Sequence, residues 1–210
     1  MSGDGGRRGG WLDEHRSDLA AQQILDAAGR LFAQRGVART AMGDVARAAG
    51  CSRTTLYRYF DGRDALRAAY VHREGRRIGR EVAEAVGGIE GPSARLVEAV
   101  LEALRRVRGE PTLAAWFAVD DRGLTVEIAR RSPVIEAIAA GFLGTPTDED
   151  VVRRARWLVR VIVSLLVMPG TDEEDEREAL ERFVAPVVVG APAHPSPERP
   201  RQDSNLWPTA

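Results

Sequence analysis

The stretch that decides the fold is residues 40–66, TAMGDVARAAGCSRTTLYRYFDGRDAL. A short helix is predicted after Thr40, its expected N-cap, because apolar residues follow at helical spacing. Those residues are Met42, Val45, Ala46 and Ala49. Gly50 supplies the positive φ that a tight turn between two helices requires. Ser52 then caps a second helix, whose inward face is Leu56 and Phe60, so the stretch predicts two helices joined by a glycine turn.

The second helix of this pair carries side chains that suit DNA. In a helix-turn-helix, the second helix enters the major groove, which is about 12 Å wide, and its amino-terminal residues reach the base edges. Arg53 can bond guanine O6 and N7 together, and a threonine can bond a base edge or a phosphate. Thr40 and Arg63, each at the start of a helix, would place donors at flanking phosphates. The predicted DNA-binding residues are Thr40, Ser52, Arg53, Thr54, Thr55, Tyr57, Tyr59 and Arg63.

Charge is distributed unevenly along the chain. The net charge is −1 over all 210 residues, which taken alone argues against a nucleic-acid binder. Residues 1–80, however, hold 15 arginines and 9 acidic residues, whereas residues 81–210 hold 15 arginines and 22 acidic residues. A basic amino-terminal third on an acidic remainder is typical of a protein that meets phosphate. We therefore expect double-stranded DNA to be a partner of the first third.

Residues 22–66 resemble the DNA-binding domain of the tetracycline-repressor (TetR) family. The residues that match the family pattern are Leu31-Phe32, Gly36, Thr40, Ala48-Ala49-Gly50, Tyr57-Arg58-Tyr59-Phe60 and Arg63. Three departures are mild: cysteine replaces an aliphatic residue at position 51, Gly43 weakens the first helix of the pair, and arginine replaces lysine at position 63. The resemblance implies a helical second domain that dimerises and holds an effector pocket, with ligand changing the spacing of the two DNA-reading helices.

Helical periodicity continues through the chain, and no segment alternates strictly as a strand does, so the predicted fold class is all-α. Glycine and proline clusters mark the breaks between helices. Further helices are expected at about 18–34, 63–86, 93–108, 112–130, 133–143, 148–168 and 172–188.

These breaks predict two domains between two tails. Residues 17–62 form the DNA-binding domain, and residues 63–190 form the effector-binding and dimerisation domain, with 63–86 as a linking helix. Residues 1–16 and 191–210 lack apolar periodicity, so we expect both to be disordered tails.

The helix at 148–168 is apolar on two sides and therefore needs two partners. We assign its wider face to a four-helix dimer interface shared with the last helix, and its second face to the domain interior. The predicted dimer residues are Ala155, Leu158, Val159, Ile162, Leu165, Leu166, Leu180, Phe183, Val184 and Val187.

A pocket for a small, largely apolar effector is expected in the second domain, because apolar walls with a few polar groups suit small molecules. The predicted lining is Trp116, Phe117, Phe142, Trp157, Val161, Ser164 and Met168. Arg153, Arg156 and Arg160 share the remaining side of the same helix. They form either a solvated face or an arginine edge that receives an anionic group of the ligand.

Three functions remain open at this point. The first is a homodimeric repressor that a ligand releases from a palindromic operator. The second is a helix-turn-helix protein without an effector, which the absence of a cavity between Trp116 and Trp157 would indicate. The third is an all-α enzyme, but the three histidines are not spaced as a metal or acid–base set, and a single cysteine excludes a multi-cysteine zinc site. We therefore expect no catalytic residue, metal or cofactor.

Neither a membrane span nor a secretory signal is predicted. No apolar run reaches the roughly 18 residues that a bilayer requires. The first residues contain arginines that no apolar segment follows. We therefore expect a cytoplasmic protein without a membrane partner.

Overall fold

The computed structural model describes residues 6–118, 123, 125, 127–128, 132–144 and 148–189, with side chains from residue 16 onward. These residues contain helices and no strand, which confirms the all-α fold class. The elements are α1 (Gly6–Arg35), α2 (Met42–Ala48), α3 (Arg53–Tyr59), α4 (Gly62–Val86), α5 (Pro92–Gly109), α6 (Pro111–Ala114), the 3₁₀ turn η1 (Ala115–Phe117), α8 (Pro133–Leu143), α9 (Glu149–Val167), α10 (Glu173–Ala179), the π-helical turn η3 (Leu180–Val184) and α11 (Ala185–Val188).

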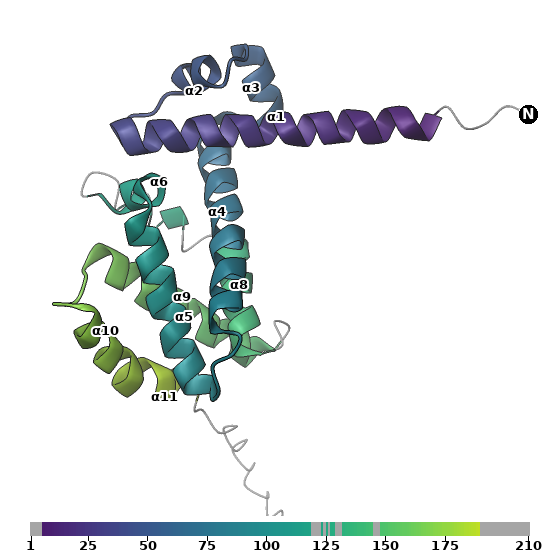
Figure 1. Cartoon of the computed structure of the whole chain (residues 1–210). Coiled ribbons are helices and arrows are strands. Elements are labelled where there is room, and N and C mark those ends of the chain that lie inside the picture. The colour runs from purple at the N-terminus through teal and green to yellow at the C-terminus, as the bar shows by residue number, and fades with distance from the viewer. Residues whose placement is uncertain are drawn as a thin grey trace, which may run out of the picture.

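The helices form two parts that share α4 (Figure 1). In the first part, α1 crosses the amino-terminal end of α4, and α2 and α3 lie on the opposite side of α1. In the second part, α5 runs beside the rest of α4, α8 and α9 pack together, and α10 and α11 cover α5 on the outside. The α4 helix therefore provides a rigid connection between the two parts.

The core of the first part includes residues from well beyond α3. Phe32, Val45 and Leu56 are buried at its centre, from α1, α2 and α3. Tyr70 of α4 and Trp116 of η1 belong to the same cluster. The helix-turn-helix thus packs against a segment of the second part.

The core of the second part is made of three smaller clusters. One joins α5, α9 and the last helical segment, and it includes Leu101, Leu158 and Leu180. A second joins α8 and α9, and a third joins α4 and α5. These clusters leave the region between α4, α5, α8 and α9 incompletely filled.

Two expected boundaries were wrong. The first helix begins at Gly6, about twelve residues before the expected start, so helix replaces most of the expected tail 1–16; no proline in this stretch stops the helix. The helix expected over 112–130 is interrupted: α6 and η1 end at Ala118, where ψ is 152°, and residues 123, 125, 127 and 128 are helical again. The expected tail 191–210 lies outside the described residues.

The expected last helix is interrupted by a π-helical turn. Pro186 has no N–H to donate to the carbonyl group four residues earlier, and its ring clashes with that carbonyl. The turn η3 accordingly comes directly before α11, the element that contains Pro186.

Candidate DNA-binding surface and ligand cavity

Local sequence chemistry fixes the geometry of the helix-turn-helix. Gly50, between α2 and α3, has φ of 70°, as the tight turn requires. Ser52 is the N-cap of α3, and its Oγ accepts a hydrogen bond from the Thr55 amide at 3.0 Å. Leu56 and Phe60 are buried in the core of the first part and anchor the helix. The remaining side chains of α3 are therefore presented outward.

The amino-terminal end of α3 has free polar side chains. Arg53 and Thr54 are exposed and make no hydrogen bond or ion pair with any described residue. Tyr57 is also exposed. A Cβ atom added to Gly43 would lie 2.6 Å from Nη2 of Arg53, so the guanidinium group rests against the α2 backbone. Glycine at position 43 therefore makes room for the arginine, a role the sequence did not suggest.

Tyr59 and Arg63 border this surface but already have partners. The guanidinium carbon of Arg58 lies 5.3 Å from the centre of the Tyr59 ring, and hydrogen bonds with Ser17 and Arg58 lower the pKa of the Tyr59 hydroxyl. Arg63 is exposed, and its Nη1 donates to the Ala38 carbonyl at 3.3 Å. Its other N–H groups remain available to a phosphate.

Thr40 has a different role from the expected one. Its side chain is only 2% exposed, and its hydroxyl donates to the Gly36 carbonyl at 2.8 Å. Ala41, and not Thr40, is the N-cap residue of α2. The Thr40 hydroxyl therefore braces the loop between α1 and α2, and its burial keeps it from a phosphate.

An apolar cavity of about 220 Å³ lies in the incompletely filled region of the second part. Its walls come mainly from α4, α5, α8 and α9, and Trp116 and Phe117 of η1 stand at one end. Glu74 also lines it, but Arg73 and Arg77 each bond its carboxylate at 2.8 Å. Thr125 donates its hydroxyl to the Trp116 carbonyl. Among the described lining residues, none therefore presents an unpaired charge to the cavity.

The cavity contains three of the seven predicted ligand residues: Trp116, Phe117 and Phe142. The other four, Trp157, Val161, Ser164 and Met168, do not line it. Trp157 and Met168 are 47% and 67% exposed on α9. A cavity is present, but it does not lie between Trp116 and Trp157.

The wider apolar face of α9 lies inward within the chain, where we expected a dimer interface. Ala155, Leu158 and Val159 are buried within one chain, and Ile162, Leu165 and Leu166 pack against the same cores. Leu180 and Val184 are buried as well, whereas Phe183 and Val187 of the predicted dimer set are exposed. This apolar side of α9 lies inward because a single chain buries its most apolar surface to complete its own core.

Several cavity residues were missed at the sequence level. The α4 helix contributes Val71, Gly75, Ile78 and Val82 to the cavity wall. Their spacings of four, three and four residues mark an apolar stripe that could have been recognised. The α4 helix is therefore a wall of the cavity as well as the link between the two parts.

The arginines of α9 do not form a free edge. Arg153 lies 3.8 Å from Glu149, and Arg156 bonds Glu136 of α8 at 2.8 Å. Arg160 is exposed. The described part of the chain contains no cluster of metal-binding side chains and no helix able to cross a bilayer.

Comparison with known proteins decides the family. Residues 24–70 match the sequence profile of the bacterial regulatory proteins, tetR family. An HTH-type transcriptional regulator of Mycobacterium tuberculosis, Rv1255c, is 51% identical over 197 residues, which cover 90% of this chain and 98% of that protein. The chain belongs to the TetR family. Because TetR-family proteins are transcriptional regulators, this one is a DNA-binding regulator and not an enzyme.

More distant relatives of this TetR-family regulator share its fold. The regulator AlkX of M. tuberculosis is 26% identical over 187 residues, which cover 80% of this chain and 84% of AlkX. The crystal structure of AlkX from Dietzia sp. is 23% identical, with a TM-score of 0.60 over 80% of this chain and 94% of that chain. The structure of RolR with resorcinol is 16% identical, with a TM-score of 0.59 over 83% of this chain and 95% of the RolR chain. At these identities the structures show the fold alone.

Proposed function

We propose that the protein is a homodimeric repressor that a small, largely apolar ligand releases from a palindromic operator. The observation that carries this proposal is the apolar cavity whose wall residue Trp116 is also part of the helix-turn-helix core. DNA contact is assigned to the exposed residues of α3, namely Arg53, Thr54 and Tyr57, with Ser52, Thr55, Tyr59 and Arg63 beside them.

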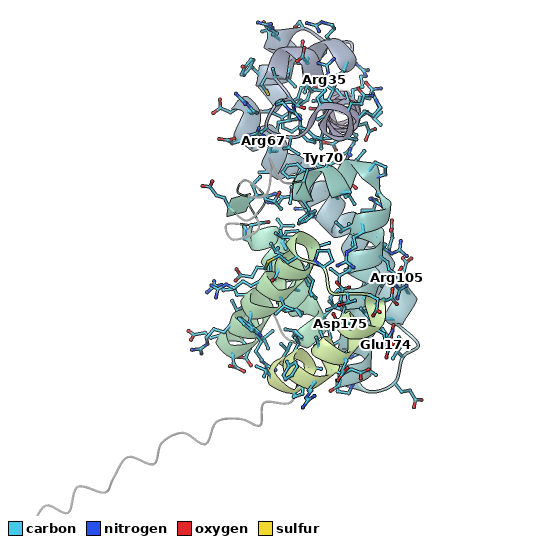
Figure 2. All side chains as sticks on the ribbon, turned by 90° about the vertical axis from the view of Figure 1, so that its left-hand side faces the viewer. Arg35, Arg67, Tyr70, Arg105, Glu174 and Asp175 are labelled. Atoms are coloured by element: carbon cyan, nitrogen blue, oxygen red, sulfur yellow. The ribbon has the colours of Figure 1, made fainter. Side chains whose placement is uncertain are left out.

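An aromatic cluster connects the cavity to the DNA-binding part. Trp116 stacks on Tyr70 with ring centres 5.9 Å apart, and both rings meet Phe32 of α1 edge-on at 5.3 Å. Tyr70 lies where the first and second parts of the molecule join (Figure 2). Its burial raises the pKa of its hydroxyl to about 12. A ligand that displaces Trp116 must therefore also disturb α1 or α4.

Release would follow from a shift between two arrangements of the dimer. Operator binding requires the two α3 helices to match half-sites about 34 to 36 Å apart. A ligand that favours a different tilt of α1 lowers the population of the matching arrangement. RolR, which shares the fold, has been crystallised with resorcinol, so a fold of this kind can hold a small molecule.

The dimer surface is assigned to the exposed apolar residues of the outer helices. Trp157, Ser164 and Met168 are exposed on α9, and Phe183 of η3 and Val187 of α11 are exposed beside them, whereas Val161 packs against the core of its own chain. The α9 and α11 helices are in contact, so the exposed residues can contribute to one four-helix interface with a second copy.

The test requires an operator, which selection from random duplex DNA can supply. Straight-chain alcohols are then added, and operator affinity is measured by fluorescence anisotropy while calorimetry follows alcohol binding. We expect alcohols to bind about fourfold more tightly for each added methylene until the cavity is full, and to weaken operator binding.

A cavity-filling variant provides the control. Ala103 lines the cavity and Ala94 is exposed on the same helix, so Ala103→Phe should abolish the response and Ala94→Phe should retain it. Alcohols that bind without changing operator affinity would support the effector-independent alternative, in which the second domain only dimerises.

A further inference from the structure

A second hollow, of about 640 Å³, lies on the outside of the second part, between α4, α5 and α8. We call it the arginine groove, because Arg76 and Arg80 of α4 and Arg95 of α5 line it. Its other described walls are glycines and apolar residues, and no carboxylate lines it among them. The groove therefore gathers positive charge without a neutralising partner.

Most neighbouring arginines are paired. On α4 and α5, Arg73, Arg77, Arg105, Arg106 and Arg108 each contact a carboxylate group. By contrast, Arg76, Arg80 and Arg95 make no hydrogen bond or ion pair with any described residue. A single exposed arginine is usually just solvated. Three arginines around one hollow, however, concentrate a positive potential that attracts an anion.

His72 responds to this charge. It lies one helical turn before Arg76 on α4. Burial lowers the pKa of its imidazole, and the positive charge of Arg76 lowers that pKa further. The positive charge of Arg76 is therefore close enough to affect a neighbouring side chain.

The arginine groove adjoins the apolar cavity. The two hollows share Gly79, Ile138 and Phe142 as walls. A Cβ atom added to Gly79 would lie 2.7 Å from Cγ2 of Ile138, so α8 packs directly on the α4 backbone at this point. The two hollows therefore meet at these three residues, and a ligand that occupies both hollows must pass the side chains of Ile138 and Phe142.

We propose that the ligand of this protein is an anionic amphiphile, with an aliphatic tail in the cavity and a carboxylate or phosphate head in the arginine groove. Arginine suits both heads, because its planar guanidinium group can donate two parallel hydrogen bonds to either. The walls of the 220 Å³ cavity are almost wholly apolar, which suits an aliphatic tail. The inference rests on the proposed function only in using its ligand cavity.

The experiment compares three probes that contain eight carbon atoms each: octanol, octanoate and octyl phosphate. Binding to the full chain is measured by calorimetry at low and at high salt. We expect at least one anionic probe to bind about tenfold or more tightly than octanol, because a charge-assisted hydrogen bond contributes more than a neutral one. The stronger of octanoate and octyl phosphate identifies the head group. Added salt should weaken the anionic probe and leave octanol unchanged.

Variants test whether the groove arginines cause the preference. The double variant Arg76→Gln, Arg80→Gln should bind octanol as before and lose the tenfold advantage of the anionic probe. Arg160→Gln is the matched control, because Arg160 is exposed, makes no ion pair with any described residue and lies outside the groove. This control should keep the advantage.

The outcomes separate this inference from the proposed function. Equal affinity for octanol and both anions, or an advantage that survives the double variant, would overturn the anionic head while leaving the apolar effector cavity in place. An advantage that depends on Arg76 and Arg80 supports the inference even if operator affinity does not respond. In that case the proposal that a ligand releases the protein from DNA would be wrong, while the inferred class of ligand would stand.

Discussion

Arg53 stands at the first position of α3, exposed and without a partner among the described residues. A guanidinium group in this place can bond guanine O6 and N7 together in the major groove. We expect Arg53→Ala to weaken operator binding by about 1–3 kcal/mol and to relax the preference at one base pair. Anisotropy with single-base operator variants measures both effects, and Arg160→Ala serves as the control. A loss that is uniform across all sequences would show that Arg53 contacts phosphate.

Gly43 permits a second prediction at the scale of one residue. Alanine is preferred to glycine by up to about 1 kcal/mol inside a helix and by less in the first turn, where Gly43 lies, so Gly43→Ala should stabilise the protein slightly. The added Cβ must displace the end of the flexible Arg53 side chain, which costs little in the free protein. Thermal unfolding and operator binding are measured together. We expect a higher melting temperature with altered operator affinity, and a fall in melting temperature would contradict this account.

At the scale of elements, an ion pair between Arg108 of α5 and Glu176 of α10 holds these two helices together. Nη2 and Nη1 of Arg108 bond the Glu176 carboxylate at 2.6 and 2.8 Å, and the Gly170 amide donates to it at 2.9 Å. These hydrogen bonds, with that of Arg108 the strongest, lower the pKa of Glu176 below its ordinary value of 4.5. The ion pair holds α10 in contact with α5 on the outer side of the second part.

Removing this charge should destabilise the protein measurably. Breaking a fully buried ion pair lowers the free energy of unfolding by roughly 3–5 kcal/mol. For Glu176→Gln we expect a loss of about 2 kcal/mol, because Arg108 is partly exposed and the glutamine amide keeps some of the hydrogen bonds. The pair contributes stability above the unfolded pKa of Glu176, and that contribution is lost as the pH falls through the lowered folded pKa. Urea unfolding at several pH values measures this dependence.

Glu174 provides the matched control for that measurement. It lies two residues away on α10, is exposed, and is 3.8 Å from Arg177 (Figure 2). An exposed ion pair contributes at most about 1 kcal/mol. Glu174→Gln should therefore unfold almost as the parent does, and equal losses in the two variants would contradict a special role for Glu176.

At the scale of the whole molecule, the exposed apolar side chains of the last segment predict the dimer. Phe183 is 64% exposed, although it is large and aromatic. We expect Phe183→Glu to give monomers in analytical ultracentrifugation and to bind operator weakly, because a buried unpaired carboxylate opposes association. Leu19→Glu is the control, since Leu19 is 53% exposed on α1. An intact Phe183→Glu dimer would place the interface elsewhere.

The helix-turn-helix was predictable from the sequence, because the residues that shape it are close together in the chain. Gly50 fixes the turn, Ser52 caps α3, and Leu56 and Phe60 bury one face, so the three helices and the outward position of Arg53 follow from spacing. The existence of α5, α8 and α9 followed in the same way from apolar periodicity and proline breaks.

Which apolar face of a helix contacts which partner depends on tertiary packing, and the sequence pattern does not reveal it. Periodicity shows that α9 has two apolar faces, but it does not show that Leu158, 3% exposed, completes the interior while Trp157 faces outward. That choice depends on how four helices fill space together. The cavity has the same origin: residues far apart in the chain, such as Ile78 and Phe142, leave a hollow only once α4 and α8 are packed. The groove around Arg76, Arg80 and Arg95 likewise became visible only when α5 was placed beside α4.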